Sequence, residues 1–197
     1  MKKSRRLFLA AALLVPVLAG LGYAGTIAYG EFAERRLIQA LNQGGYVIYL
    51  RHADRAAGNK EPFNAQSALA DFADCTGQRN LTDEGRANAR RIGVRFKELG
   101  IPVGSVFAIP LCRTRDTANL AFGKATLDPR FYDPAFVATL LGTAPEAGTN
   151  TVLVGSDYQA HALVGVDLGF GEAAVFQPDG KGGYRYLGVL DREDLVY

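Results

Sequence analysis

Short apolar runs of strand length alternate along this chain with longer segments whose apolar positions recur at helical spacing. The runs at residues 45–50, 103–108 and 151–156 are mainly apolar, and each is bounded by glycine, proline or a polar residue. The runs at residues 45–50 and 151–156 predict strands that are buried on both faces, and the run at residues 103–108 predicts another short strand. Residues 83–99 instead carry apolar side chains three or four positions apart, which predicts an amphipathic helix behind the N-cap residue Thr82.

The rest of the chain continues this alternation. Residues 31–41 have helical composition, and residues 127–148 are expected to form a partly helical connection. The runs at residues 172–178 and 184–190 flank the turn sequence DGKGG, which predicts an antiparallel hairpin. The elements together predict an α/β fold with three layers, in which a mainly parallel sheet carries helices on both faces and is closed by the hairpin.

The first strand run ends in Arg51 and His52, and His52 is one of only two histidines in the chain. In an open α/β sheet, ligands bind at the carboxyl ends of the strands. Arginine is a permanent planar cation that suits phosphate, and its charge beside a histidine favours the neutral, nucleophilic imidazole. The pair alone is equally consistent with a strand that ends in a solvated basic pair.

A second arginine, Arg113, follows the run at residues 103–108 and lies near the start of the next expected helix. The first turn of a helix is a ready anion site, although Arg113 could also be an ordinary surface arginine. Residues 53–73 form a long polar loop, which is typical of a functional lid or a disordered segment. This loop carries no motif that identifies a substrate.

The first 30 residues differ in composition from the rest. They contain four basic residues, no acidic residue and an uncharged, largely apolar stretch at residues 7–30. Residues 1–30 are therefore expected to be a cleaved signal peptide, with the twin-arginine-like sequence SRRLFL, or an N-terminal membrane anchor. Either would place residues 31–197, the single expected folded domain, outside the cytoplasm: periplasmic, secreted or anchored to the membrane.

The net charge of +2 reflects this segment. Without its four basic residues, 18 basic residues face 20 acidic ones. A slightly acidic domain lacks the basic footprint of a nucleic-acid-binding protein. We therefore expect no nucleic-acid partner, and a membrane contact only through residues 1–30 if that segment is not cleaved.

Four segments, in this order along the chain, resemble the histidine phosphatase superfamily, which includes phosphoglycerate mutases and acid phosphatases. YLRHADR is similar to the Arg-His-Gly nucleophile motif, with Ala53 in place of glycine, and RNLTDEGRANARRIG is similar to the helix that follows it. IPLCRTRDTA is similar to the arginine-containing third motif, and NTVLVGS with GEAAVFQPDG is similar to the last. The resemblance covers residues 44–190 and implies a phosphoglycerate mutase-like fold.

The resemblance also implies a chemistry. His52 would attack phosphorus in line and form a phosphohistidine that water hydrolyses, while Arg51 and Arg113 would bind the phosphoryl oxygens. The arginines would supply the positive charge, so no metal or other cofactor is expected; the histidines and cysteines also lack metal-ligand spacing. The partner would be a phosphorylated small molecule or a phosphoprotein.

The chain departs from the family pattern at the second essential histidine, where it has Ser156. A hydroxyl group can bind a phosphate oxygen but brings no charge, and loss of one such stabilising group typically costs about 100- to 1000-fold in rate. His161 lies five positions on and could swing toward the site, but an isolated histidine on a helix is more often a surface or packing residue. Ile109 also replaces a small hydroxyl residue of the third motif.

The sequence does not identify which residue would be the general acid. Asp157 is the first candidate, because phosphatases of one branch carry an aspartate directly after the second histidine. Asp54 and Glu172 are further candidates, and each of the three could equally be an ordinary solvated carboxylate.

Cys75 and Cys112 are the two cysteines of the chain and lie 37 positions apart. In an exported domain, two cysteines predict one disulfide, which would stabilise the fold by about 3–4 kcal/mol. A nucleophilic cysteine is the alternative, but no histidine partner is implied near either one.

Two functions of different classes follow. The first is an exported phosphomonoester hydrolase of the histidine phosphatase type, which depends on Arg51, His52 and Arg113. The second is a catalytically weak or inactive phosphatase-like module that binds a phosphorylated ligand or partner, which depends on Ser156 and Ile109. A tethered domain with a purely structural role is a third possibility.

Overall fold

The structure is a computed structural model that describes residues 34–197. The chain divides into two units, residues 1–37 and residues 38–197. The signal peptide or anchor expected at residues 1–30 lies outside the described residues, and residues 34–41 are helical, as the sequence predicts. Within the described part of the chain, no helix is both long and apolar enough to cross a membrane.

A six-stranded mixed sheet forms the centre of the larger unit, with the strand order β3-β2-β4-β1-β5-β6. The pairs β1–β4, β2–β4 and β2–β3 are parallel, whereas β5 runs antiparallel to both β1 and β6. The predicted parallel sheet closed by an antiparallel hairpin is thus confirmed. The strands are β1 (Val47–Arg51), β2 (Val103–Ala108), β3 (Thr126–Leu127), β4 (Asn150–Gly155), β5 (Ala173–Pro178) and β6 (Tyr184–Leu190).

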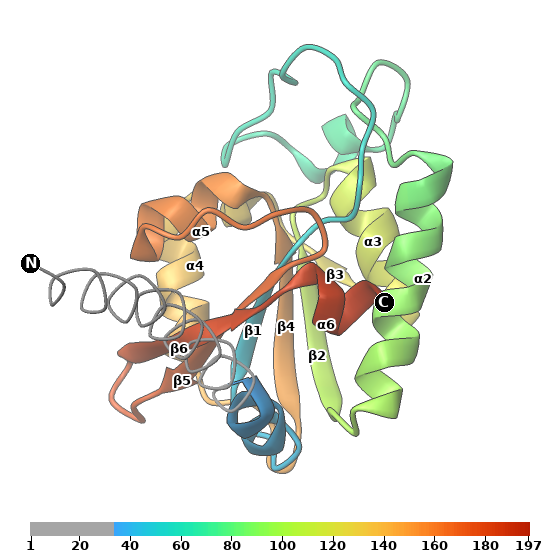
Figure 1. The fold of residues 1–197 in the computed structure, drawn as a ribbon. Helices are drawn as coiled ribbons and strands as arrows, with labels where there is room; N and C mark the ends of the chain where they lie inside the picture. Colours follow the sequence, from blue (N-terminus) through green and yellow to red (C-terminus); the bar gives the residue numbers. More distant parts are fainter. Residues whose placement is uncertain (1–33) are drawn as a thin grey trace, which may run out of the picture. The chain divides into compact units, whose positions relative to one another are not determined.

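Helices cover both faces of this sheet, which gives the three layers that the sequence predicts. In Figure 1, α2 and α3 lie on one side of the strands and α4 and α5 lie on the other, while α6 packs against α2. The helices are α2 (Asp83–Glu98), α3 (Cys112–Phe122), α4 (Pro134–Leu141), α5 (Asp157–Val164) and α6 (Arg192–Val196), with 3-10 helices at Leu69–Phe72 and Pro129–Tyr132.

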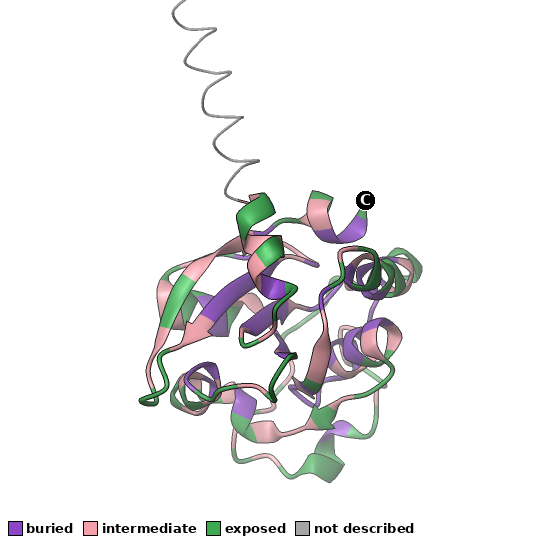
Figure 2. Ribbon diagram, turned by 90° about the horizontal axis from the view of Figure 1, so that it is seen from below, coloured by how far each residue is buried: buried purple, intermediate pink, exposed green. Residues whose placement is uncertain are grey.

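The core follows the two-residue period of the strands. Val47 and Tyr49 of β1 belong to one buried cluster with Val137 and Leu141 of α4. Ile48 lies between them in sequence, is also fully buried, and faces the opposite layer, because successive strand side chains alternate between the faces. Figure 2 shows the consequence: buried residues concentrate in the strands and on the inner sides of the helices, and exposed residues lie on the outer turns.

The start of α2 is docked onto the chain just beyond β1. Thr82 caps the helix, because its hydroxyl oxygen accepts a hydrogen bond from Gly85 N at 2.9 Å. The Thr82 backbone N–H donates to the Asp54 carbonyl oxygen at 3.1 Å. A Cβ atom at Gly85 would lie 1.9 Å from that same oxygen, so only glycine permits the approach. This contact fixes the backbone that follows the predicted nucleophile.

The connection at residues 127–148, whose elements the sequence pattern does not define, contains regular helices. Residues 127–148 contain the 3-10 helix and α4, which begin behind the capping side chains of Asp128 and Asp133. Each of the two is followed by proline at the first helical position. Strand β3 has only two residues and α6 has five, and elements so short leave no periodic signal in a sequence.

Candidate active site

The carboxyl ends of neighbouring strands bring the predicted site residues together. Arg51 at the end of β1 pairs in register with Gly155 at the end of β4. The next residues, His52 and Ser156, therefore follow adjacent strands, and the His52 backbone N–H donates to the Gly155 carbonyl at 3.0 Å. This is the strand-end position at which an open α/β sheet holds its ligand.

His52 is 2% exposed, and its two ring nitrogens have different partners. Nδ1 lies 2.8 Å from the carbonyl oxygen of Ala53, and Nε2 lies 3.2 Å from Nε of Arg113. A carbonyl can only accept and a guanidinium can only donate, so this geometry assigns the proton to Nδ1 and the lone pair to Nε2. Burial lowers the pKa of His52 to about 3, with Arg113, Arg51 and Arg55 acting in the same direction against the Ala53 hydrogen bond. The ring is therefore neutral, with its lone pair on Nε2.

Arg113 lies in the first turn of α3, where the sequence places it, and its side chain is 4% exposed. Nε donates to His52, and Nη1 donates to Oε1 of Glu61 at 2.7 Å. Burial lowers the pKa of Arg113, and the Glu61 carboxylate opposes that effect. The surface-arginine alternative is therefore wrong, because this guanidinium is buried against the predicted nucleophile.

Arg51 lines the same pocket as His52. Its guanidinium carbon lies 4.1 Å from the centroid of the Phe170 ring, and Nη1 donates to the Leu168 carbonyl oxygen. Nη2 lies 3.5 Å from Oδ2 of Asp157. Nε is buried and has no hydrogen-bond partner among the described residues. A buried N–H donor without a partner is costly, and an anionic ligand would satisfy it.

Asp157 begins α5, and both Ser156 and Asp157 line the pocket that contains His52. Ser156 is the N-cap residue, but its side chain makes no capping hydrogen bond and remains available to a ligand. Its backbone carbonyl accepts a hydrogen bond from the Tyr49 hydroxyl at 2.8 Å, which ties α5 to the core of the sheet. Asp157 is half exposed beside Arg51, so it lies at the mouth of the pocket.

Glu61 and Arg79 lie in the site although the sequence analysis did not single them out. Both come from the segment between β1 and α2, and Glu61 Oε2 accepts from Arg79 Nη2 at 2.8 Å. Burial alone would raise the pKa of Glu61, but hydrogen bonds from Arg79 and the charge of Arg113 lower it to about 2. A lone acidic residue in a loop without a motif gives no signal in the sequence. Arg79 is the first residue of the segment RNLTDEGRANARRIG, but nothing in that segment indicates where its side chain points.

The segment that carries these residues is fixed rather than open. Cys75 and Cys112 form a disulfide, as predicted, and it joins this segment to the first residue of α3. The Gln78 side chain adds a second link, because its amide oxygen accepts from the Cys112 backbone N–H at 3.0 Å. Phe63 and Phe72, with ring centroids 4.4 Å apart, anchor the outer part of the segment on the core.

Other candidates from the sequence have different surroundings. Asp54 accepts hydrogen bonds from Arg192 at 2.7 Å and from Asn88 at 2.9 Å, which gives it a structural role between α2 and α6. Glu172 accepts from the Gly169 backbone N–H at 2.7 Å. His161 is exposed on α5 and contacts Asp167 at 2.8 Å. None of the three is among the residues that line the pocket around His52. Ile109 is fully buried in the core.

The pocket around His52 has a volume of about 550 Å³ and carries more positive than negative charge. Its cationic side chains are Arg51, Arg55, Lys60, Arg79 and Arg113, and its acidic ones are Glu61 and Asp157. An excess of three positive charges around a neutral imidazole suits a dianionic ligand such as a phosphoryl group. Among the described residues, no group of three or more His, Cys, Asp or Glu side chains could hold a metal ion.

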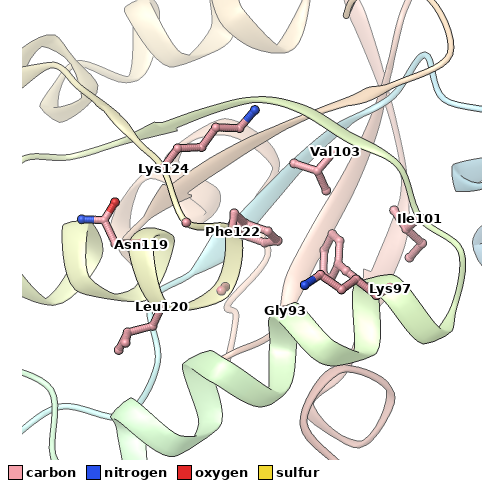
Figure 3. Close-up of a pocket in the computed structure, with 11 residues that line it drawn as sticks. Gly93, Lys97, Ile101, Val103, Asn119, Leu120, Phe122 and Lys124 are labelled. Atoms are coloured by element: carbon pink, nitrogen blue, oxygen red, sulfur yellow. The ribbon is translucent and has the colours of Figure 1, made fainter.

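A second cavity of about 540 Å³ lies between the ends of α2 and α3, and Figure 3 shows the residues that line it. Its charged side chains are Lys97 and Lys124, and the other labelled residues are apolar apart from Asn119. The cavity contains neither a nucleophile nor an acid–base pair, so its chemistry does not suggest catalysis.

The sequence matches no protein-family model and no curated protein. Solved structures do match. The protein histidine phosphatase SixA, solved with tungstate, is 17% identical with a TM-score of 0.53, over 76% of this chain and 99% of that one. A phosphoserine phosphatase variant from Entamoeba histolytica, solved with phosphoserine, is 13% identical with a TM-score of 0.52, over 76% of this chain and 98% of that one. A mycobacterial hydrolase is 14% identical with a TM-score of 0.51, over 72% of this chain and 96% of that one.

Each of these three structures matches at least 72% of this chain with a TM-score above 0.5, so they share its fold. The fold that the four sequence segments imply is therefore confirmed. The chain has the phosphoglycerate mutase-like α/β fold that the four segments imply, and it shares this fold with these solved structures.

Proposed function

We propose that this protein is a phosphomonoester hydrolase of the histidine phosphatase type, with His52 as its nucleophile. The observation that carries the proposal is the state of His52. The ring is buried and neutral, its proton is held at Nδ1 by the Ala53 carbonyl, and Nε2 faces a pocket with five cationic side chains. A carbonyl that fixes the tautomer leaves the opposite nitrogen as the nucleophile.

In the proposed reaction, Nε2 of His52 attacks phosphorus in line, a P–N bond forms, and the P–O bond to the leaving group breaks. Arg113 and Arg51 bind the phosphoryl oxygens, whose charge they offset in the transition state. Arg113 must turn its Nε–H from His52 to the phosphoryl group, because the lone pair cannot accept from it and attack at once. Water then cleaves the P–N bond, which releases inorganic phosphate and regenerates neutral His52.

The leaving oxygen needs a proton, and we propose Asp157 as its donor. Asp157 first takes a proton from solvent and gives it to the leaving oxygen, and its carboxylate then accepts the proton of the water that cleaves the P–N bond. Asp157 lies at the mouth of the pocket, half exposed and 3.5 Å from Arg51. A leaving group that points from the phosphoryl site toward solvent would pass this carboxyl group. Asp54 and Glu172 are less suited to the role because both are held by other partners outside the pocket.

A binding module without turnover is the second candidate, and two observations favour it. Ser156 brings no positive charge where the family pattern has a histidine, and the His52 lone pair is occupied by Arg113 in this structure. Such a module would hold a phosphorylated small molecule or a phosphoprotein at the same arginines. SixA is described as a protein histidine phosphatase and the Entamoeba protein as a phosphoserine phosphatase, so both kinds of ligand merit testing.

We further propose that the domain works outside the cytoplasm. The Cys75–Cys112 disulfide is compatible with an oxidising compartment, in which such bonds persist. Four basic residues before an apolar stretch at the N-terminus support export or anchoring. Cell fractionation of the tagged full-length protein, followed by thiol labelling with and without reduction, would test both points.

Hydrolysis of an aryl phosphate by the purified full-length protein tests the function. His52→Ala should abolish turnover, and trapping with radiolabelled substrate should yield an acid-labile phosphoprotein only when His52 is present. His161→Ala is the matched control, since it removes the other histidine, which is exposed and lies outside the pocket. Phosphate binding without turnover would support the binding module, and a failure to bind phosphate or any phosphomonoester would contradict both candidates.

A further inference from the structure

The pocket contains an anion cradle that no part of the sequence analysis predicts, and the chain's own Glu61 fills it. Glu61 Oε1 accepts from Arg113 Nη1 at 2.7 Å and from the Arg79 backbone N–H at 2.8 Å. Oε2 accepts from Arg79 Nη2 at 2.8 Å and from Arg79 Nε at 3.2 Å. The Glu61 carboxylate is 4% exposed and the Arg79 side chain 17% exposed. One buried carboxylate thus holds two guanidinium groups side by side.

Arg79 is thereby placed next to the group that binds the nucleophile. Arg113 contacts both Glu61 and Nε2 of His52, and Arg79 shares Glu61 with it. Arg79 also lines the pocket that contains His52 and Ser156. The pKa of Arg79 is raised, first by its hydrogen bond to Glu61 and also by the charge of Asp157, the residue after Ser156. The guanidinium therefore lies within electrostatic reach of the strand end where the family pattern has its second histidine.

The donors of both guanidinium groups are not used up by Glu61. Among the described residues, Arg113 Nη2 and Arg79 Nη1 make no hydrogen bond to the protein. Arg51, whose Nε is buried without a partner, and Ser156, whose side chain makes no capping bond, line the same pocket. A phosphoryl group between these residues would find donors from three arginines and one serine.

We propose that Arg79 is a phosphoryl-binding residue that supplies the positive charge that Ser156 lacks, and that Glu61 is the positioning residue that aims Arg79 and Arg113 at the ligand. The inference rests on the proposed phosphoryl site and adds one residue, Arg79, to those that bind the phosphoryl group. The positive charge that the family pattern places on a histidine would here be placed on an arginine. A guanidinium group is permanently protonated and offers several donors in a plane, so it replaces an imidazolium at an anionic group without depending on pH. The alternative is that the Arg79–Glu61 ion pair only braces the segment between β1 and α2.

Two single substitutions separate these possibilities, because each breaks the same ion pair from a different side. Arg79→Gln removes the charge from the phosphoryl site, whereas Glu61→Gln breaks the pair but keeps the guanidinium. The probe is inorganic phosphate, and the readout is its dissociation constant for the full-length protein by titration calorimetry. If Arg79 binds the phosphoryl group, Arg79→Gln should weaken phosphate binding at least about tenfold more than Glu61→Gln does. Equal losses in the two variants would overturn the proposal.

Matched controls lie on α2. Arg95 and Glu98 form an ion pair at 2.8 Å outside the pocket, so Arg95→Gln and Glu98→Gln should leave phosphate affinity unchanged. If Arg79→Gln fails to fold, Arg79→Lys retains the charge but loses the planar fork, and it should still bind phosphate at least about threefold more weakly than Glu61→Gln. Affinity equal to that of Glu61→Gln would overturn the proposal.

The result also distinguishes this inference from the proposed function. Phosphate binding by the unmodified protein with equal losses in both variants overturns the role of Arg79 alone. The role of Arg79 alone is also overturned if His52→Ala abolishes turnover while Arg79→Gln keeps the kcat/KM of the unmodified protein. If the unmodified protein binds no phosphate, the phosphoryl site itself is wrong, and the role of Arg79 falls with it.

Discussion

Nε of Arg113 donates a hydrogen bond to Nε2 of His52 at 3.2 Å, so the two residues are paired through the atom that would attack phosphorus. The strand that ends at Arg51 and the helix that begins at Cys112 bring them together across 61 positions of sequence. Burial keeps the imidazole neutral, and the charge of Arg113 acts in the same direction. The contact also holds a buried cation at the point where a phosphoryl group would arrive. In the proposed reaction, Arg113 must first exchange this hydrogen bond to His52 for one to a phosphoryl oxygen.

Acid should destabilise the fold through His52. The pKa of His52 is about 3 in the folded protein against an ordinary value of 6.5, so the unfolded chain binds more protons between these values. The free energy of unfolding should therefore fall as the pH drops from 6.5 toward 3, by up to about 1.4 kcal/mol per pH unit from this residue. Urea unfolding of the unmodified protein and of His52→Gln between pH 6.5 and 4.5 measures this slope. A slope that is equally steep in both proteins would contradict the burial of a neutral His52.

Below pH 4.5 a second group adds to this loss. The pKa of Glu61 is about 2 in the folded protein and ordinarily 4.5, so the stability that its ion pairs provide is present above 4.5 and is lost as the pH falls toward 2. Glu61→Gln should flatten the stability profile in this lower window only. A flattening that extends up to pH 6.5 would place the titrating group elsewhere.

Reduction of the Cys75–Cys112 disulfide should lower both stability and phosphate affinity. The bond closes a loop of 37 positions, and its loss should cost about 3–4 kcal/mol on the chain-entropy model. It also joins the segment that carries Arg79 to the first turn of α3, which carries Arg113. Urea unfolding and phosphate titration of the Cys75→Ser, Cys112→Ser double variant measure the two effects. Unchanged phosphate affinity in the folded double variant would mean that the loop holds both arginines without the bond.

Gly155→Ala should distort the strand end beside His52. A Cβ atom at Gly155 would lie 1.9 Å from the Tyr49 hydroxyl oxygen, and Tyr49 is 1% exposed and cannot move aside. The variant should lose about 1–3 kcal/mol of unfolding free energy, as overpacked cores do, together with most phosphate affinity. Tyr49→Phe removes the closest clashing atom, so the double variant should recover part of the stability that Gly155→Ala loses. Strictly additive losses would show that the two residues do not collide.

Ser156→His should raise the rate of hydrolysis. Ser156 lines the pocket and makes no capping hydrogen bond, so its replacement removes no stabilising contact of its side chain. An imidazolium there should increase kcat/KM by about 100- to 1000-fold if no other group already supplies that charge. Because we assign that charge to Arg79, the gain should be smaller in the unmodified protein than in the Arg79→Gln background. Steady-state assays of the four proteins in this cycle measure the difference.

The sequence by itself determined the sheet, its main helices and the centre of the site. Uninterrupted apolar runs can be stable only when buried on both faces, so β1 and β4 were recognisable, and the residues that end β1 had to lie at the carboxyl edge of the sheet. Local signals also placed the start of α2 at Thr82 and of α3 near Arg113, and two cysteines in a domain expected to be exported predicted their bond.

Only the tertiary structure decided which polar residues complete the site. Glu61 and Arg79 are ordinary charged residues in a loop without periodicity, and they become a buried pair because the disulfide and Phe63 and Phe72 fold that loop over the strand ends. The tertiary structure also pairs Asp54 with Arg192 and leaves Asp157 at the pocket mouth. Sequence patterns record burial and local hydrogen bonding, whereas the partner of a loop side chain depends on long-range packing that no local pattern encodes.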